Sequence, residues 1–164
     1  MKYDNSGIRR QDRLLDEPRA RALLAEGEYG VLSMVAPEGQ PYAIPVSFVW
    51  DGDSTLYMHC APEGRKLECL KACPDVSFCV VGGTQVLPRQ FTTLYESVVV
   101  QGRASIGLEP EERLEALRMI VRKYAPEFAE VGEKYMKASF PRTEVIRLDM
   151  VSASGKAKAA HRKS

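Results

Sequence analysis

A predicted strand, a short loop containing glycine and two cations at the start of a helix form the stretch of sequence best suited to chemistry. The strand ends near Cys60, and Arg65 and Lys66 fall in the first turn of a helix that the pattern predicts over Gly64–Ala72. Backbone N–H groups at a helix start favour an anion, and arginine and lysine both suit a phosphate. The helix dipole alone would favour carboxylates there. The pair therefore predicts a phosphate site, with a solvated surface charge pair as the alternative.

No set of side chains typical of catalysis without a cofactor stands out. A Ser-His-Asp triad would need His59, since His161 lies in a Lys/Ala-rich tail, and no G-x-S-x-G elbow supplies the serine. A Cys60–His59 dyad fails because adjacent residues of a strand point to opposite faces. Glu111 and Glu112 are explained by a favourable position in the first turn of a helix. We therefore expect any chemistry to come from a bound cofactor.

The four cysteines do not have the spacing of a metal site. Cys60, Cys69, Cys73 and Cys79 contain no C-x-x-C pair, and their spacings match no zinc arrangement. We predict reduced thiols that pack as small hydrophobes, and no metal.

Periodicity and turn residues predict a mainly β domain that carries these groups. A first helix is expected after Asp16, with Gly27 as a left-handed stop, and Asp51-Gly52-Asp53 is a hairpin signal. The run 76–81 is typical of a strand buried on both faces. Hairpin-connected strands with helices at intervals indicate an antiparallel barrel with peripheral helices. Strands are expected at 29–36, 42–50, 56–60, 76–81, 91–106 and 143–151, and further helices at 110–124 and 126–139.

Length and charge limit the classes of protein that fit. The chain has 164 residues, which we interpret as a single domain over residues 1–155 followed by a basic, flexible tail over 156–164. The formal net charge of +1 offers no global field for nucleic acid or an anionic membrane. No apolar run approaches the ~20 residues of a membrane span, and the first residues lack the apolar stretch of a secretory signal. The cytoplasm is the expected compartment.

Six segments, taken in order, carry a family resemblance that covers roughly Arg9 to Gly155. They are Arg9–Arg13, Gly30–Ser33, Pro41–Phe48, His59–Lys66, Val76–Val81 and Phe91–Ala104. Together they resemble the flavin-binding proteins related to pyridoxamine 5′-phosphate oxidase, and within them the nitroimidazole-resistance (Nim) branch. The resemblance implies a six-stranded antiparallel split β-barrel of the FMN-binding type. It also implies a homodimer with two flavin sites at the subunit interface.

The resemblance further implies four groups of cofactor-binding residues. The basic pair 65–66, after Gly64, would hold the flavin phosphate, and the strand end 59–61 would lie along the cofactor. The backbone of 45–47 would face the isoalloxazine ring, and the strand 95–97 would reach the flavin from the partner subunit. The implied residues are Pro45, Val46, Ser47, His59, Cys60, Ala61, Gly64, Arg65, Lys66, Tyr95, Glu96 and Ser97.

His59 is the candidate catalytic residue. It either contacts the flavin or a neighbour as an ordinary strand residue, or it donates a proton to a reduced substrate or binds a small acid. Nim members often have histidine where Arg65 stands, whereas the oxidase branch has arginine. The arginine-rich C-terminal strand of the oxidase is not found here, so oxidation of pyridoxamine phosphate is not expected.

Three functions follow from these interpretations. The first is a flavin-dependent oxidoreductase that uses FMN, or FAD, to reduce nitroaromatic or quinone-like acceptors with reduced nicotinamide as donor. The second is a non-catalytic protein that binds or stores a flavin, heme or deazaflavin. The third is a protein that binds a phosphorylated metabolite through Arg65 and Lys66 without redox chemistry.

Overall fold

The strands form one open barrel in the computed structural model, which describes residues 1–159. The sheet has the order β3-β2-β6-β7-β8-β5-β4 with all of these pairs antiparallel, and β1 adds to β8 in parallel. Among the described strands, the end strands β3 and β4 do not pair with each other. Six long strands and two two-residue strands confirm the mainly β, six-stranded antiparallel split barrel. The strands are β1 (Lys2–Tyr3), β2 (Gly30–Val35), β3 (Pro41–Val46), β4 (Val49–Trp50), β5 (Thr55–Cys60), β6 (Asp75–Leu87), β7 (Thr92–Ser105) and β8 (Glu144–Lys158).

Helices occupy the connections between strands. Asp16 caps the first helix by accepting the backbone N–H of Arg19 at 2.8 Å. Gly27 ends this helix at φ −57°, so the expected left-handed stop is wrong. A Cβ at Gly27 would lie 2.7 Å from the side chain of Val80, so close packing requires the glycine. The described helices are α1 (Glu17–Glu26), α2 (Arg65–Ala72), α3 (Pro110–Tyr124) and α4 (Ala129–Ser139), with 3₁₀ turns η1 (Gln11–Arg13), η2 (Pro88–Gln90), η3 (Pro126–Phe128) and η4 (Phe140–Arg142).

Strands β6 and β7 form a longer hairpin than the sequence pattern indicated. Pairing continues beyond Gly82-Gly83 after a register shift before Gln85, so the two glycines mark an irregularity and not the end of the strand. The prediction that 76–81 is buried on both faces is wrong. Val76, Phe78 and Val80 are buried, but Ser77 and Cys79 between them are partly exposed and Val81 is exposed. An apolar run does not reveal whether this chain itself covers the second face.

Strand β8 passes the domain boundary that was expected at residue 155. Lys156 pairs with Ser97 and Lys158 with Tyr95, so residues 156–158 belong to the sheet and not to a flexible tail. The neighbouring strand β7 is long enough to supply backbone hydrogen-bond partners for these residues. Their polar side chains alone do not reveal this pairing. Of the predicted tail, residues 160–164 lie outside the described residues.

The hydrophobic core has two parts. The larger fills the barrel, where Phe48 and Phe78 meet edge to face with ring centres 5.0 Å apart. The smaller lies on the other side of the sheet, between the β4, β5 and β8 strands and the α3–α4 hairpin. Its buried residues are Val49, Ala116, Leu117, Ile120, Met136 and Val145.

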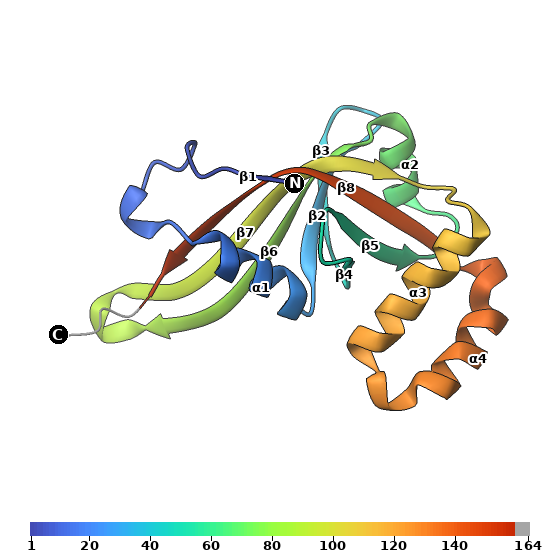
Figure 1. Cartoon of the computed structure of the whole chain (residues 1–164). Coiled ribbons are helices and arrows are strands. Elements are labelled where there is room, and N and C mark those ends of the chain that lie inside the picture. Colours follow the sequence, from blue (N-terminus) through green and yellow to red (C-terminus); the bar gives the residue numbers. More distant parts are fainter. Residues whose placement is uncertain (160–164) are drawn as a thin grey trace.

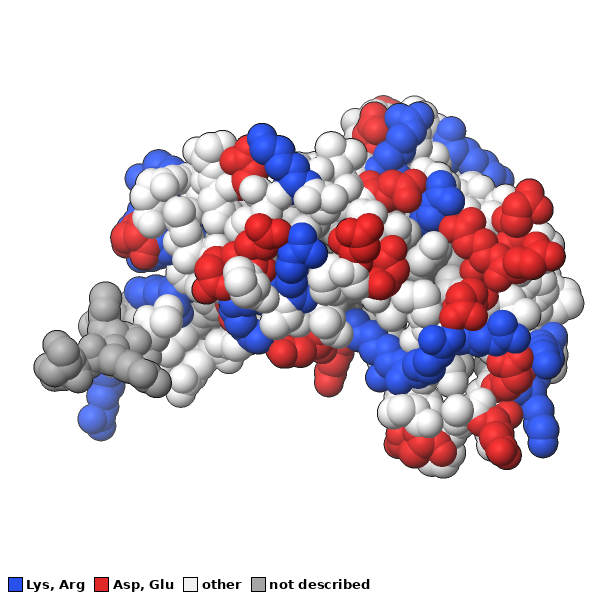
Figure 2. Space-filling view, in the orientation of Figure 1, with Lys and Arg blue, Asp and Glu red and all other residues white. Residues whose placement is uncertain are grey.

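The elements are distributed unevenly around the barrel (Figure 1). The α3–α4 hairpin projects beside β5 at one end, whereas the β6–β7 hairpin extends toward the opposite end, next to α1. Basic and acidic side chains are mixed over the helical hairpin (Figure 2), and Arg118 of α3 pairs with Glu133 of α4 at 2.9 Å. In the part of the chain that the structure describes, no helix has the length and apolar character needed to cross a membrane.

Candidate functional site

The cationic pair of the sequence lies at the first turn of α2. Gly64 precedes it with φ +122°, a backbone conformation that L side chains rarely adopt, and its Cβ position has no atom within 4 Å. The carbonyl of Gly64 accepts the N–H groups of Leu67 at 2.9 Å and Glu68 at 3.3 Å. The N–H groups of Arg65 and Lys66 have no acceptor inside the helix. The site therefore combines free backbone donors, two side-chain cations and open space.

Arg65 is held loosely by two neighbours. Its guanidinium lies 5.2 Å from the centre of the Tyr42 ring and 3.8 Å from the Glu38 carboxylate. The side chains of Arg65 and Glu38 are 54% and 65% exposed, and exposed ion pairs contribute about 0–1 kcal/mol. An incoming anion can therefore take the guanidinium from Glu38 at small cost.

His59 and Cys60 point to opposite faces at the end of β5, as the alternation of a strand requires. Cys60 packs against the barrel core, and burial raises the pKa of its thiol. His59 faces the α3–α4 hairpin, where desolvation and then the charge of Lys66 lower the pKa of its imidazole. His59 is therefore neutral near pH 7, and the excluded Cys60–His59 dyad is not formed.

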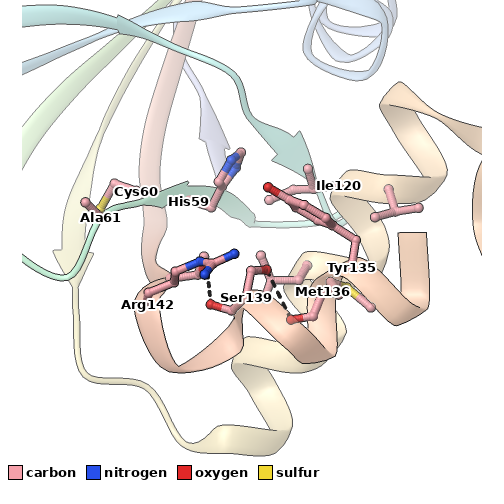
Figure 3. A pocket seen from close by; sticks show the side chains of 11 residues that line it. His59, Cys60, Ala61, Ile120, Tyr135, Met136, Ser139 and Arg142 are labelled. Atoms are coloured by element: carbon pink, nitrogen blue, oxygen red, sulfur yellow. Dashed lines mark hydrogen bonds between the residues drawn. The ribbon is translucent and has the colours of Figure 1, made fainter. Parts of the chain in front are cut away.

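A cleft of about 460 Å³ opens between this strand end and the helical hairpin. Its walls combine apolar side chains with five polar ones, from His59, Tyr135, Ser139, Arg142 and Thr143 (Figure 3). The phenol of Tyr135 and the guanidinium of Arg142 extend from the α4–η4 side toward His59. The lining residues are His59, Cys60, Ala61, Leu117, Ile120, Val121, Tyr135, Met136, Ser139, Arg142 and Thr143.

The predicted strand over 42–50 is divided, and the division exposes part of the implied ring site. β3 ends at Val46, which is half-buried, while Pro45 and Ser47 are exposed. Ser47 lines a second cavity of about 650 Å³ together with Tyr29, Lys123 and Tyr124.

A buried polar group with no partner lies at this second cavity. The Lys123 ammonium lies 4.0 Å from the centre of the Phe48 ring, and within residues 1–159 its Nζ has no hydrogen-bond partner. Desolvation lowers the pKa of Lys123 to about 8. The Tyr124 hydroxyl beside it accepts the Phe48 N–H at 3.0 Å and lies 2.7 Å from the Phe48 carbonyl.

Tyr95, Glu96 and Ser97 lie on β7, in the part of the β6–β7 hairpin that extends away from α2 (Figure 1). Glu96 is occupied within the chain, because its carboxylate accepts hydrogen bonds from Arg19 of α1 and its pKa is lowered by them. The Ser97 hydroxyl donates to the Lys156 carbonyl at 3.4 Å. The structure therefore brings 59–61 and 64–66 together in one protomer, but not 95–97.

The outer face of the sheet carries two rows without charge. Strand register aligns Val31 and Cys79 with Val99, and Ser33 and Ser77 with Gln101. The rows extend to the edge strand β3 and to β8, and charged pairs appear only beyond them, as at Asp75 and Arg103. The complete rows are Pro45-Val31-Cys79-Val99-Ser154 and Ala43-Ser33-Ser77-Gln101-Ser152.

Sequence reasoning missed Tyr42, Tyr135 and Arg142. Tyr42 is part of the resembling segment but has no motif of its own. Tyr135 and Arg142 are about 80 positions from His59 in the sequence and belong to an amphipathic stretch whose polar residues read as ordinary surface. Only the fold of the α3–α4 hairpin onto β5 shows their proximity. Within residues 1–159, no three His, Cys, Asp or Glu side chains are arranged to hold a metal ion.

Comparison with known proteins identifies a family that the chain matches. A family model described as pyridoxamine 5′-phosphate oxidase matches residues 16–157. No curated protein matches the chain.

Solved structures share the fold. A candidate 5-nitroimidazole antibiotic resistance protein from Bacteroides thetaiotaomicron has 22% identity and a TM-score of 0.72, with 88% of this chain and 86% of that chain covered. An FAD-binding protein from Mesorhizobium loti has 25% identity and a TM-score of 0.62, with 90% and 98% covered. An FAD and heme binding protein from Mycobacterium smegmatis has 16% identity and a TM-score of 0.77, with 92% and 75% covered.

Proposed function

The chain belongs to the pyridoxamine 5′-phosphate oxidase family, and on that premise we propose that it is a homodimeric, flavin-dependent oxidoreductase. It would bind FMN, or FAD, at the subunit interface and reduce a small planar acceptor, nitroaromatic or quinone-like, with reduced nicotinamide as donor. Binding of FAD by the Mesorhizobium loti and Mycobacterium smegmatis proteins supports the choice of a flavin.

The cationic start of α2 carries the proposal. Arg65, Lys66 and the free N–H groups there fit the phosphate next to the ribityl chain, which FMN and FAD share. Lys66 forms no ion pair with another of residues 1–159, and Glu38 holds Arg65 only weakly. The residues present therefore fit the phosphate of a flavin. They do not distinguish FMN from FAD, because an adenosine group would lie beyond this shared phosphate.

The uncharged rows of the outer sheet support a homodimer. Val31, Cys79 and Val99 are apolar, partly exposed and aligned across three strands, and no element of residues 1–159 covers them. A second copy of the same face would bury these residues without desolvating a charge. Residues 95–97 could then reach the cofactor held by the partner, as the resemblance implies.

The residues of the cleft have separate proposed roles in the reaction. When bound, the flavin supplies two-electron redox chemistry, which the protein side chains lack. The apolar walls of α3 and α4 exclude water from the bound acceptor. His59 presents an imidazole that is neutral near pH 7 and can hold a proton at a ring nitrogen facing the cleft.

A binding or storage role without turnover is the second candidate. It is favoured by the shared fold with the FAD and heme binding protein, and it needs the same phosphate site. Oxidation of reduced nicotinamide by the flavin-loaded protein in the presence of a nitroaromatic or quinone separates the two candidates. Steady consumption of nicotinamide supports the oxidoreductase, and its absence supports the binding role.

Titration of the protein with FMN and with riboflavin tests the phosphate site. Arg65→Ala should weaken FMN binding by roughly ten- to 150-fold, since it removes a charge-assisted hydrogen bond worth ~1.5–3 kcal/mol. Arg65→Glu should weaken it further through repulsion. Riboflavin, which has no phosphate, should bind the wild type and Arg65→Ala equally.

Lys71→Glu is the matched control, because it reverses an exposed charge at the other end of the same helix. It should leave FMN binding unchanged. Equal FMN affinity of the wild type and Arg65→Glu would contradict the proposed phosphate site.

A further inference from the structure

We propose that the cleft between β5 and the α3–α4 hairpin binds a small planar carboxylate, with Arg142 as its cation and the Tyr135 hydroxyl as a second donor. This assigns a recognition role to two residues that the cofactor site does not use. That the bound carboxylate is the electron acceptor rests on the proposed function.

The walls of the cleft select the shape of the ligand. Leu117, Ile120 and Val121 of α3 pack with Met136 of α4 and form one apolar wall of the cleft of about 460 Å³. Pockets of this size, with apolar walls and few polar groups, are typical of small-molecule sites. A single aromatic ring can lay one of its faces on this apolar wall.

The polar ends in the cleft select the chemistry of the ligand. In Figure 3 the guanidinium of Arg142 and the phenol of Tyr135 approach the same region of the cleft from consecutive elements. Neither side chain forms an ion pair or a side-chain hydrogen bond with another of residues 1–159. Both groups can donate hydrogen bonds, and a guanidinium matches the two oxygens of a carboxylate. The two donors therefore fit a carboxylate attached to the ring.

The charges around the cleft favour an anion. No lining residue is Asp or Glu, and the positive charge of Lys66 reaches His59 at the strand end. The nearest acid in sequence, Glu144, adds to the effect of burial in raising the pKa of the Cys60 thiol. Its charge is partly balanced by Arg113 at 3.8 Å and by the N–H of Val145, which it accepts at 2.8 Å. A cation entering the cleft would meet Arg142 without a carboxylate to balance it.

Calorimetric titration of the full-length protein with benzoate and with benzamide tests the proposal. The two probes have similar shape, but only benzoate is charged. The wild type should prefer benzoate by about tenfold or more, the effect of a charge-assisted hydrogen bond. Arg142→Gln should remove that preference and leave benzamide binding unchanged. Tyr135→Phe should weaken benzoate binding by roughly two- to tenfold, because a neutral hydrogen bond is lost.

Arg122→Gln is the matched control, since it removes an exposed charge from the same hairpin but does not line the cleft. It should bind both probes as the wild type does, and thermal melting should show all variants folded. The proposal is overturned if the wild type binds both probes equally, or binds neither at millimolar concentration. It is also overturned if Arg122→Gln loses as much benzoate affinity as Arg142→Gln.

Titrations with and without FMN separate this proposal from the proposed function. Selective benzoate binding without any FMN binding would support the carboxylate site and remove the flavin role. FMN binding without benzoate selectivity would do the reverse.

Discussion

The outer surface of the sheet has two halves that differ in whether helices cover them. Beside β5 and β8, Val145 is completely buried under the α3–α4 hairpin. Across β2, β6 and β7, Val31, Cys79 and Val99 also face outward, yet they remain partly exposed within one protomer. Both halves carry apolar side chains, but residues 1–159 provide a cover for only one. The proposed homodimer would account for this difference, because a second copy would cover the second half.

The covered half is also held by hydrogen bonds from side chains of α3 to the backbone of other elements. Arg113 of α3 donates to the Phe140 carbonyl at 3.1 Å, and Tyr124 binds the backbone of Phe48. Such contacts connect elements of one chain in a fixed geometry. The bare half instead presents uncharged side chains in register, which suits a symmetric contact between identical surfaces.

The largest expected effect is on dimer formation, through the bare half of the sheet on β2, β6 and β7. Val99→Glu would place a carboxylate in the centre of the proposed interface, and an uncompensated buried charge costs about 3–5 kcal/mol. Light scattering should give twice the 18.3 kDa of the chain for the wild type and a single chain mass for the variant.

Val131→Glu is the comparison for this change, because Val131 lies on α4 and is 65% exposed. It should leave the dimer intact. A wild-type mass of one chain would show that the bare half has no such partner.

The next largest effect is on the fastening of the covered half. Tyr124→Phe leaves the Phe48 N–H and carbonyl without their side-chain partner at a fully buried residue. We expect a loss of about 1–3 kcal/mol in the free energy of unfolding, measured by urea denaturation. Tyr29→Phe, at an exposed tyrosine in the same cavity, should change stability by less than about 0.5 kcal/mol.

The smallest effect concerns the partnerless amine beside Tyr124. Burial lowers the pKa of Lys123 from 10.5 to about 8, so below pH 8 the folded state must hold a charge that the unfolded state solvates better. Lys123→Met should therefore stabilise the protein at pH 7, by about 1 kcal/mol after allowing for solvent at this half-buried site. The gain should shrink as the pH rises from 8 to 10.5, where both states become neutral in turn. Urea denaturation at pH 7 and pH 10 checks this, and an equal gain at both values would contradict it.

The predicted elements show what local sequence can reveal. The cap at Asp16, the helix start at Gly64 and the apolar spacing of α3 depend on neighbours within a few residues, and each is confirmed. Gly27 and the 76–81 strand were misread because their roles depend on Val80 packing against Gly27 and on which sheet face remains bare. The strand status of 156–158 likewise depends on a distant partner, β7.

The sequence by itself determined the mainly β class, the family and the cationic turn at Arg65 and Lys66, because all of these depend on residue order and local backbone preference. Only the tertiary structure decided which residues meet His59 across the cleft. The side chains of Tyr135 and Arg142 reach it through the packing of a helical hairpin against β5, a long-range contact that leaves no periodic mark in the sequence. The separation of 95–97 from Arg65 within one chain was decided in the same way, because the long β6–β7 hairpin carries those residues away from α2.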